Sequence, residues 1–108
     1  MPKLRDLHPK LEGTIESGVL IHDCPVDGNA HRIRTPVSSQ PFHEEDHDPP
    51  EFWPNGKPRR KKIWQATGEF PDTLTLSPSI NIVEVDPDTG EAKRTLCWHG
   101  FVKNGEAN

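Results

Sequence analysis

INIVEVDPDTGEAKRTLCW, residues 80–98, is the stretch of sequence that decides the fold class. Apolar and polar side chains alternate over residues 80–85, as they do along a strand with one buried face. The segment that follows, DPDTGE, has a proline and a glycine at positions that favour a tight turn. Residues 92–98 then have the pattern of a returning strand. The stretch therefore predicts an antiparallel β-hairpin that turns between Pro87 and Gly90.

Further short strand patterns lie on both sides of this hairpin. Residues 19–23 and 31–37 flank the turn-forming segment CPVDGN and give a second predicted hairpin. Residues 63–66 and 73–76 have the composition of two more strands, and residues 100–103 of another. The sequence therefore predicts an all-β fold, a small antiparallel sheet or sandwich of about six or seven short strands.

Length and composition limit the chain to one small domain, residues 1–108, with a modest core. Lys and Arg number 13 against 17 Asp and Glu, which gives a net charge of −4, and only 31% of residues are apolar. The 12 prolines and 8 glycines exclude a helical bundle or a coiled coil. A chain with so little apolar material needs a further stabiliser, for which a metal ion and a partner protein are the candidates.

The distribution of apolar residues gives no sign of a membrane partner. The longest apolar runs, such as residues 19–21, fall far short of the roughly 18–20 residues that a membrane span needs. The first residues of the sequence lack the apolar stretch of a secretory signal peptide. We therefore expect the protein to act in the cytoplasm.

Two segments interrupt the strand pattern. Residues 1–17 form a polar N-terminal arm that we expect to be mostly irregular, because Pro9 interrupts any helical turn. Residues 38–62, SSQPFHEEDHDPPEFWPNGKPRRKK, hold five prolines and an acidic run followed by a basic run. We expect an irregular, solvated insertion whose charges pair with one another. The acidic run and the net negative charge argue against nucleic acid as a partner.

Three large aromatic side chains stand out in this polar insertion: Phe42, Phe52 and Trp53. Aromatic anchors tend to dominate the binding energy of protein interfaces, and prolines lower the entropy lost on docking. We therefore expect the segment 38–62 to contact a protein partner or a second copy of the chain. The alternative is that the same aromatic residues cap the sheet of their own chain.

The two cysteines, Cys24 and Cys97, point to a metal site, since a lone disulfide is disfavoured in a reducing compartment. Cys24 opens a C-P-x-D-G turn, which resembles a zinc knuckle with Asp27 at the second ligand position. A carboxylate oxygen can also bind zinc. His22 precedes Cys24 by two residues and is expected on the same face of the strand.

The second half of the predicted site is Cys97-Trp98-His99, where an extended strand would direct Cys97 and His99 to the same side. The sequence thus predicts zinc held by Cys24, Cys97 and His99, with Asp27 or His22 as the fourth ligand. The alternative is that both cysteines are small apolar core residues near surface histidines.

Most of the chain, about residues 19–105, resembles a small bacterial and phage family of unknown function, whose members are sometimes mislabelled as ammonia monooxygenase. The matching blocks are Trp64, FPDTLTLSPSI at residues 70–80 and CWHGFVKNG at residues 97–105, together with Cys24 and the H-x-I motif His31-Arg32-Ile33. The resemblance implies zinc binding through a cysteine-rich knuckle, although Asp27 stands where the family has its second cysteine. Some relatives are encoded beside ubiquitin-like conjugation genes, which implies a peptidase role for them.

These observations lead to two hypotheses about function. The first is a non-enzymatic, zinc-stabilised β module of phage or bacterial origin, acting as a protein-interaction or virion-associated accessory protein in the host cytoplasm or the virion. The second is a hydrolase, such as a peptidase acting on ubiquitin-like conjugates, with a metal-bound water or Ser79 near His99 as the reactive group. A closed shell of four protein ligands favours the first hypothesis, and an open coordination position favours the second.

Overall fold

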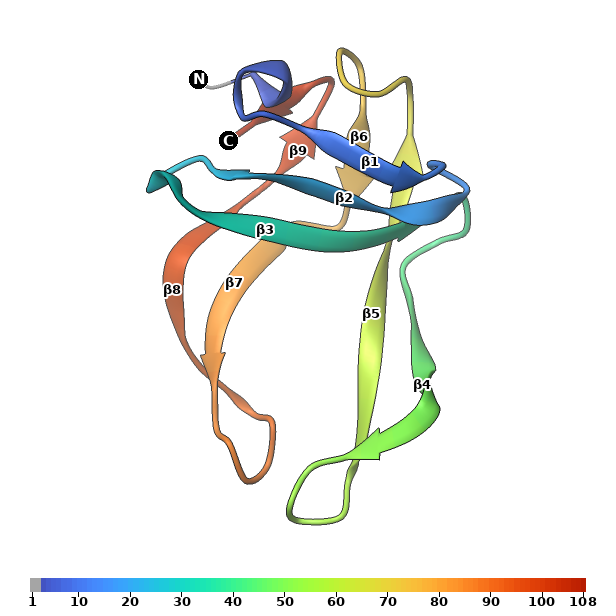
Figure 1. Ribbon diagram of the computed structural model, residues 1–108, viewed down its shortest axis with the longest axis vertical. Coiled ribbons are helices and arrows are strands. Elements are labelled where there is room, and N and C mark those ends of the chain that lie inside the picture. The colour runs from blue at the N-terminus through green and yellow to red at the C-terminus, as the bar shows by residue number, and fades with distance from the viewer. Residues whose placement is uncertain (1–2) are drawn as a thin grey trace.

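The computed structural model describes residues 3–108 and confirms the all-β prediction (Figure 1). One short 3-10 helix, η1 (Leu4–Asp6), precedes the strands. The strands in this part of the chain are β1 (Lys10–Gly13), β2 (Ser17–Cys24), β3 (Gly28–Ser38), β4 (His43–Phe52), β5 (Pro58–Thr67), β6 (Thr75–Ser77), β7 (Ile80–Val85), β8 (Ala92–Gly100), β9 (Val102–Lys103) and β10 (Glu106–Ala107).

The largest sheet has the strand order β1-β2-β3-β5-β4, and β6 pairs with β5. Strands β7 and β8 form a two-stranded sheet, as do β9 and β10. All pairings are antiparallel except that of β3 with β5, which joins Val37 to Trp64 and Ser38 to Gln65. Between these two strands the chain turns into β4 and then reverses into β5, which runs beside the end of β3.

The hairpin predicted from residues 80–98 is present as β7 and β8. Its turn is closed by hydrogen bonds from the backbone N–H of Gly90 to the carbonyl of Asp86, and from the N–H of Asp86 to the carbonyl of Glu91. Gly90 has a φ of +75°, which explains why glycine occupies this position. The Asp86 carboxylate also accepts a hydrogen bond from the N–H of Asp88 at 2.8 Å.

The expectation of an irregular segment at 38–62 is wrong, because β4 and the first half of β5 form a long hairpin there. Its antiparallel register sets the acidic run against the basic run, with Glu45 opposite Lys61 and Asp46 opposite Arg60. The register shifts between Asp46 and Glu51, so residues 47–50 form a bulge that holds two of the prolines. Proline is tolerated in a bulge because no ladder hydrogen bond is required there.

The N-terminal arm is also more regular than expected in its described part, residues 3–17. Leu4 and Leu7 are buried in the core, and β1 extends the sheet by pairing with β2. Next to β1, the carboxylate of Asp23 lies 2.6 Å from Nδ1 of His8 and accepts a 2.6 Å hydrogen bond from Arg32. These contacts hold the arm against the body. The first two residues of the predicted arm lie outside the described residues.

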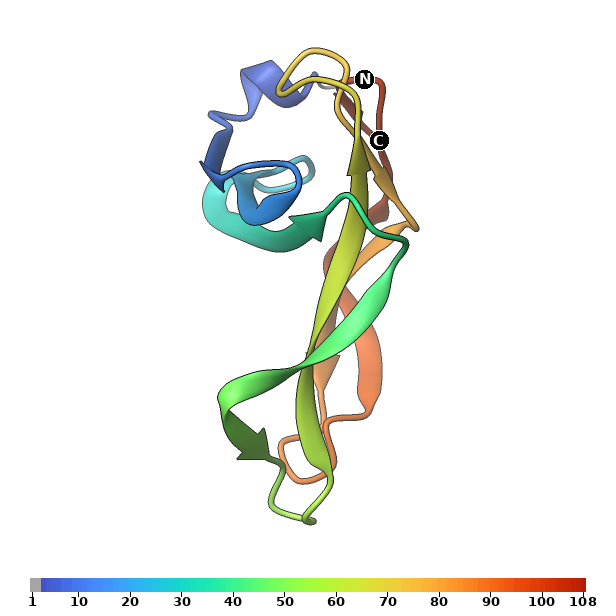
Figure 2. The same ribbon diagram turned by 90° about the vertical axis from the view of Figure 1, so that its right-hand side faces the viewer.

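The core is small and lies in the body of the molecule, where β1–β3 cross the upper ends of β5 to β8 (Figures 1 and 2). Its fully buried side chains include Leu4, Leu20, Leu74, Val102 and Cys24. Two hairpin arms, β4–β5 and β7–β8, extend from the body in the same direction and meet at their tips. There the N–H of Asn55 donates a 3.1 Å hydrogen bond to the carbonyl of Asp88.

Candidate metal centre

The turn between β2 and β3 has the knuckle geometry that the sequence predicts. Cys24 is buried at the end of β2, and the backbone N–H of Asp27 faces its Sγ at 3.4 Å. The register between the two strands shifts after Asp23, because Cys24 pairs with Gly28 while Asp23 pairs with Arg32. The irregularity turns the chain tightly around the Cys24 sulfur.

The β8 strand brings Cys97 to this turn, which confirms the expected proximity of Cys24 and Cys97. Cys97 Sγ lies 3.0 Å from Nε2 of His31, and Nδ1 of His31 lies 3.5 Å from the carboxylate of Asp27. One ligand atom from each of Cys24, Asp27, His31 and Cys97 lies within 4.8 Å of all the others. We call these four residues the ligand cluster, and they lie close enough together to bind a metal ion.

The electrostatics of the ligand cluster favour a cation. Partial burial, the neighbouring sulfur of Cys24 and the charge of Asp27 raise the pKa of the Cys97 thiol to about 11. Removing a proton from Cys97 therefore adds negative charge where the site already carries some. A bound metal ion reverses this balance, because it stabilises thiolate and carboxylate together. The donor set of two sulfurs, one nitrogen and one oxygen fits such an ion.

The structure does not bring His99 into the ligand cluster, although the sequence analysis places it there. Asn81 pairs with His99 and Val83 pairs with Thr95, so one residue of β7 stands opposite three residues of β8. This bulge next to Cys97 breaks the strict alternation on which the prediction relied. Nε2 of His99 lies instead 3.5 Å from Oγ of Ser79, and His99 is exposed whereas Ser79 is half-buried.

His22 also stays outside the ligand cluster, since the register shift before Cys24 separates the directions of the two side chains. Its Nδ1 donates a 2.7 Å hydrogen bond to the carbonyl of Asp23, and its ring packs edge-on against Trp98 with centroids 5.9 Å apart. Burial lowers the pKa of His22, so the ring is neutral near pH 7. Its Nε2 has no hydrogen-bond partner among the described residues. His22 is thus a core residue behind the site.

His31 is the member of the ligand cluster that spacing alone missed. It lies four residues after Asp27 and is the fourth residue of β3. The signal in the sequence is the H-x-I motif at residues 31–33, which follows the predicted knuckle. The arrangement C-x-x-D-x-x-x-H within the hairpin supplies three of the four ligands, and β8 supplies the fourth.

The three aromatic residues of the β4–β5 hairpin have different surroundings. Phe42 packs edge-on against Trp64, with ring centroids 5.2 Å apart. Trp53 is half-buried at the tip, where its ring faces the guanidinium of Arg59 at 4.7 Å. Phe52 is 63% exposed. Two of the three therefore contact their own chain, and Phe52 faces solvent.

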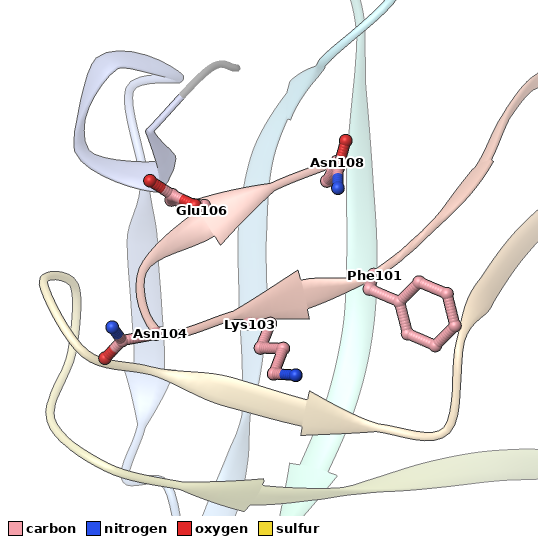
Figure 3. A pocket seen from close by; sticks show the side chains of 5 residues that line it. All are labelled: Phe101, Lys103, Asn104, Glu106 and Asn108. Carbon is pink, nitrogen blue, oxygen red and sulfur yellow. The ribbon is translucent and has the colours of Figure 1, made fainter.

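A hollow of about 500 Å³ lies beside the β9–β10 hairpin (Figure 3). It is lined by Phe101, Lys103, Asn104, Glu106 and Asn108. None of the four residues of the ligand cluster borders this hollow, so it is separate from the candidate metal centre.

Comparisons of the chain with protein-family models, curated proteins and solved structures find no match. Among the described residues, no helix is long and apolar enough to cross a membrane.

Proposed function

We propose that this chain is a small, non-enzymatic β module whose ligand cluster binds a structural zinc ion. The observation that carries the proposal is the convergence of Cys24, Asp27, His31 and Cys97 within 4.8 Å. Zinc prefers four-coordinate sites built from sulfur, nitrogen and carboxylate oxygen, and four protein ligands leave no position for a reactive water. A closed shell of this kind supports a structural role over a catalytic one.

The zinc ion would link parts of the chain that the small core holds together only weakly. Three ligands belong to the β2–β3 turn, and Cys97 belongs to β8 at the root of the second arm. Binding would therefore fix the β7–β8 arm to the body. Because the ligands are brought together only in the folded chain, metal binding and folding are coupled.

Native mass spectrometry of the purified protein, together with melting curves before and after EDTA, tests this site. We expect one zinc ion per chain and a strong drop in melting temperature on chelation. The matched variants His31→Ala and His99→Ala separate the ligand cluster from the set predicted by spacing. His31→Ala should lose zinc, whereas His99→Ala should retain it. Metal-free protein with a melting curve unchanged by EDTA contradicts the proposal.

The proposed role of the module is to bind another protein, or a second copy of the chain, through the β4–β5 arm, in a bacterial cytoplasm or a virion. Phe52 supports this because it is a large apolar side chain at the far end of an arm, exposed to 63%. The residues of β4 and of the first half of β5 are mostly exposed as well. A hairpin with so little buried surface gains stability from a partner or from a second copy of the chain.

Paired substitutions of neighbouring aromatic residues test the binding role. Phe52→Ala should leave the melting temperature unchanged and weaken self-association in sedimentation equilibrium, or binding to a co-purifying partner. Trp53→Ala should lower the melting temperature, because Trp53 contacts Arg59 and the other arm. If Phe52→Ala leaves every association unchanged, the arm is not a binding surface.

A hydrolase remains the second candidate, and the 3.5 Å approach of Ser79 Oγ to His99 Nε2 is the observation that favours it. The pair has the residue types of a nucleophile and its base. However, the contact between Ser79 and His99 is exposed to solvent, and 3.5 Å is long for a hydrogen bond between a nucleophile and its base. Both features favour the structural role of the module. Labelling by a fluorophosphonate probe that is lost in Ser79→Ala would support the hydrolase and contradict the non-enzymatic proposal.

A further inference from the structure

The ligand cluster contains both cysteines of the chain, and the two differ in their access to solvent. Cys24 is fully buried in the β2–β3 turn, whereas Cys97 on β8 is only partly covered. The sequence has no third cysteine, so an intrachain disulfide can join only these two residues. Among the four ligands, the sulfur atoms are also the ones that mild oxidants attack.

The contacts within the cluster hold the two sulfurs toward each other. The N–H of Asp27 faces Cys24 Sγ at 3.4 Å, and Nε2 of His31 lies 3.0 Å from Cys97 Sγ. Since all four ligand atoms lie within 4.8 Å of one another, the two sulfurs have to approach by less than about 3 Å to reach the roughly 2.05 Å of a disulfide bond. The bulge of β8 at residues 96–98 leaves this strand segment free of a regular ladder.

We propose that the Cys24–Cys97 pair is an oxidation site. Hydrogen peroxide oxidises the two thiolates to an intrachain disulfide, and the bound metal ion is released. This inference rests on the proposed zinc site. It adds to that site a class of reagent, the hydroperoxides, and a chemical modification of two named residues. It also makes the link between β8 and the body responsive to oxidation, a use of disulfides that occurs in reducing compartments.

The chemistry proceeds in two balanced steps. The Cys97 thiolate attacks hydrogen peroxide, the O–O bond breaks, and Cys97 sulfenic acid and hydroxide form. The Cys24 thiolate then attacks the sulfenic sulfur, and a second hydroxide leaves as the disulfide forms. Two protons from solvent convert both hydroxides to water. Overall, two thiolates, one hydrogen peroxide and two protons give one disulfide and two waters.

Loss of the two thiolates removes the metal ion as well. Asp27 and His31 would remain, and both are exposed. One carboxylate and one imidazole bind zinc far more weakly than a site with two additional thiolates. The disulfide would keep β8 covalently joined to the β2–β3 turn while the metal leaves. A thiol reductant and added zinc would restore the original state.

The test uses the full chain, purified in reductant, loaded with zinc and then treated with an equimolar amount of hydrogen peroxide. Zinc release is followed with a chromogenic chelator, free thiols are counted, and the disulfide is located by peptide mapping under non-reducing conditions. His31→Ala serves as the variant with a weakened metal site and both cysteines. Cys97→Ser serves as the variant that cannot form the disulfide.

We expect zinc release in step with the loss of both thiols, a mapped Cys24–Cys97 disulfide, and recovery of zinc binding after dithiothreitol. His31→Ala should form the same disulfide more slowly, because it retains both sulfurs but loses the metal ion that keeps them as thiolates. Sulfinic or sulfonic acid at Cys97, disulfides between chains, or zinc retained after thiol loss each overturn the inference. Absence of zinc before treatment contradicts the proposed function alone, since disulfide mapping in the same sample still decides the oxidation site.

Discussion

The indole ring of Trp53, at the tip of the β4–β5 arm, occupies the place where a side chain on Gly90 would stand, at the tip of the β7–β8 arm. A Cβ atom built on Gly90 would overlap the ring atoms of Trp53. The hydrogen bond from Asn55 to Asp88 lies beside this contact. The two arms are therefore joined at their far ends as well as at the body, and a glycine makes that junction possible.

Substituting the two tip glycines distinguishes this contact from ordinary turn strain. Gly56 and Gly90 both have positive φ, +88° and +75°, but a side chain on Gly56 would meet open space. Gly56→Ala should therefore cost only the strain of the left-handed conformation, about 1 kcal/mol. Gly90→Ala should cost roughly 1–3 kcal/mol more, because it also displaces Trp53. Equal losses in chemical denaturation of both variants would contradict the junction.

The opposed charges of β4 and β5 give a second prediction. Arg60 lies 3.0 Å from the carboxylate of Asp46 in the neighbouring strand. Both side chains are largely exposed, so the pair should contribute only about 0.5 kcal/mol, within the range for cross-strand ion pairs. Each reversal, Asp46→Lys or Arg60→Glu, should destabilise the protein, and the double variant should recover part of the loss. A double-mutant cycle at low and at high salt measures this coupling, which should weaken as salt rises. A coupling energy of zero between Asp46 and Arg60 at low salt would show that this ion pair does not stabilise the pairing of β4 with β5.

The buried carboxylate of Asp23 gives a third prediction. Hydrogen bonds from His8 and Arg32 hold the pKa of Asp23 below its ordinary value, and its side chain is almost fully covered. Arg32→Met should leave the buried Asp23 carboxylate with His8 as its remaining side-chain partner. The free energy of unfolding should therefore fall by about 2 kcal/mol. Arg34→Met on the same strand is the control, because Arg34 pairs with Glu12 at the surface and should be nearly neutral. Similar urea midpoints for both variants would contradict the role of Asp23.

Local turn chemistry made part of this fold predictable. Pro87 and Gly90 mark the β7–β8 turn, because a tight turn requires particular residue types at particular positions. In the same way, Cys24 marks the start of the β2–β3 turn. The arm formed by β4 and β5 was missed since proline content argued for irregular chain. Its prolines lie in the bulge, in the turn at the tip and at the start of β5, where the ladder needs no N–H from them. The pairing of acidic with basic residues across the strands was the signal for a hairpin.

The candidate site was predictable in its cysteines and Asp27 but not in its histidine. Strand alternation predicts His99 on the same face as Cys97, and His22 on the same face as Cys24. This alternation holds only where the strand is regular. Both cysteines lie next to register shifts, which change the direction of the side chains. Bulges leave little trace in a single sequence, so strand alternation could not indicate His31.

The ring of His43, on β4, faces an acceptor with each of its nitrogens. Nδ1 lies 2.9 Å from the carbonyl of Pro41, and Nε2 lies 3.1 Å from the carboxylate of Glu45. A neutral imidazole has one N–H, so only the protonated ring can donate to both acceptors. The hydrogen bond to Pro41 and then that to Glu45 therefore raise the pKa of His43 above its ordinary value of 6.5.

Because the pKa of His43 is higher in the folded chain than in the unfolded chain, protonation stabilises the fold. This contribution should be fully present below about pH 6.5, the unfolded value, and should be lost as the pH rises through the raised folded value. NMR titration should show the pKa of His43 falling part of the way back in Glu45→Gln, since the Pro41 carbonyl remains. Glu44→Gln is the matched control and should leave it unchanged. Identical titration curves for His43 in Glu45→Gln and in the unsubstituted protein would show that Glu45 does not hold the proton on this ring.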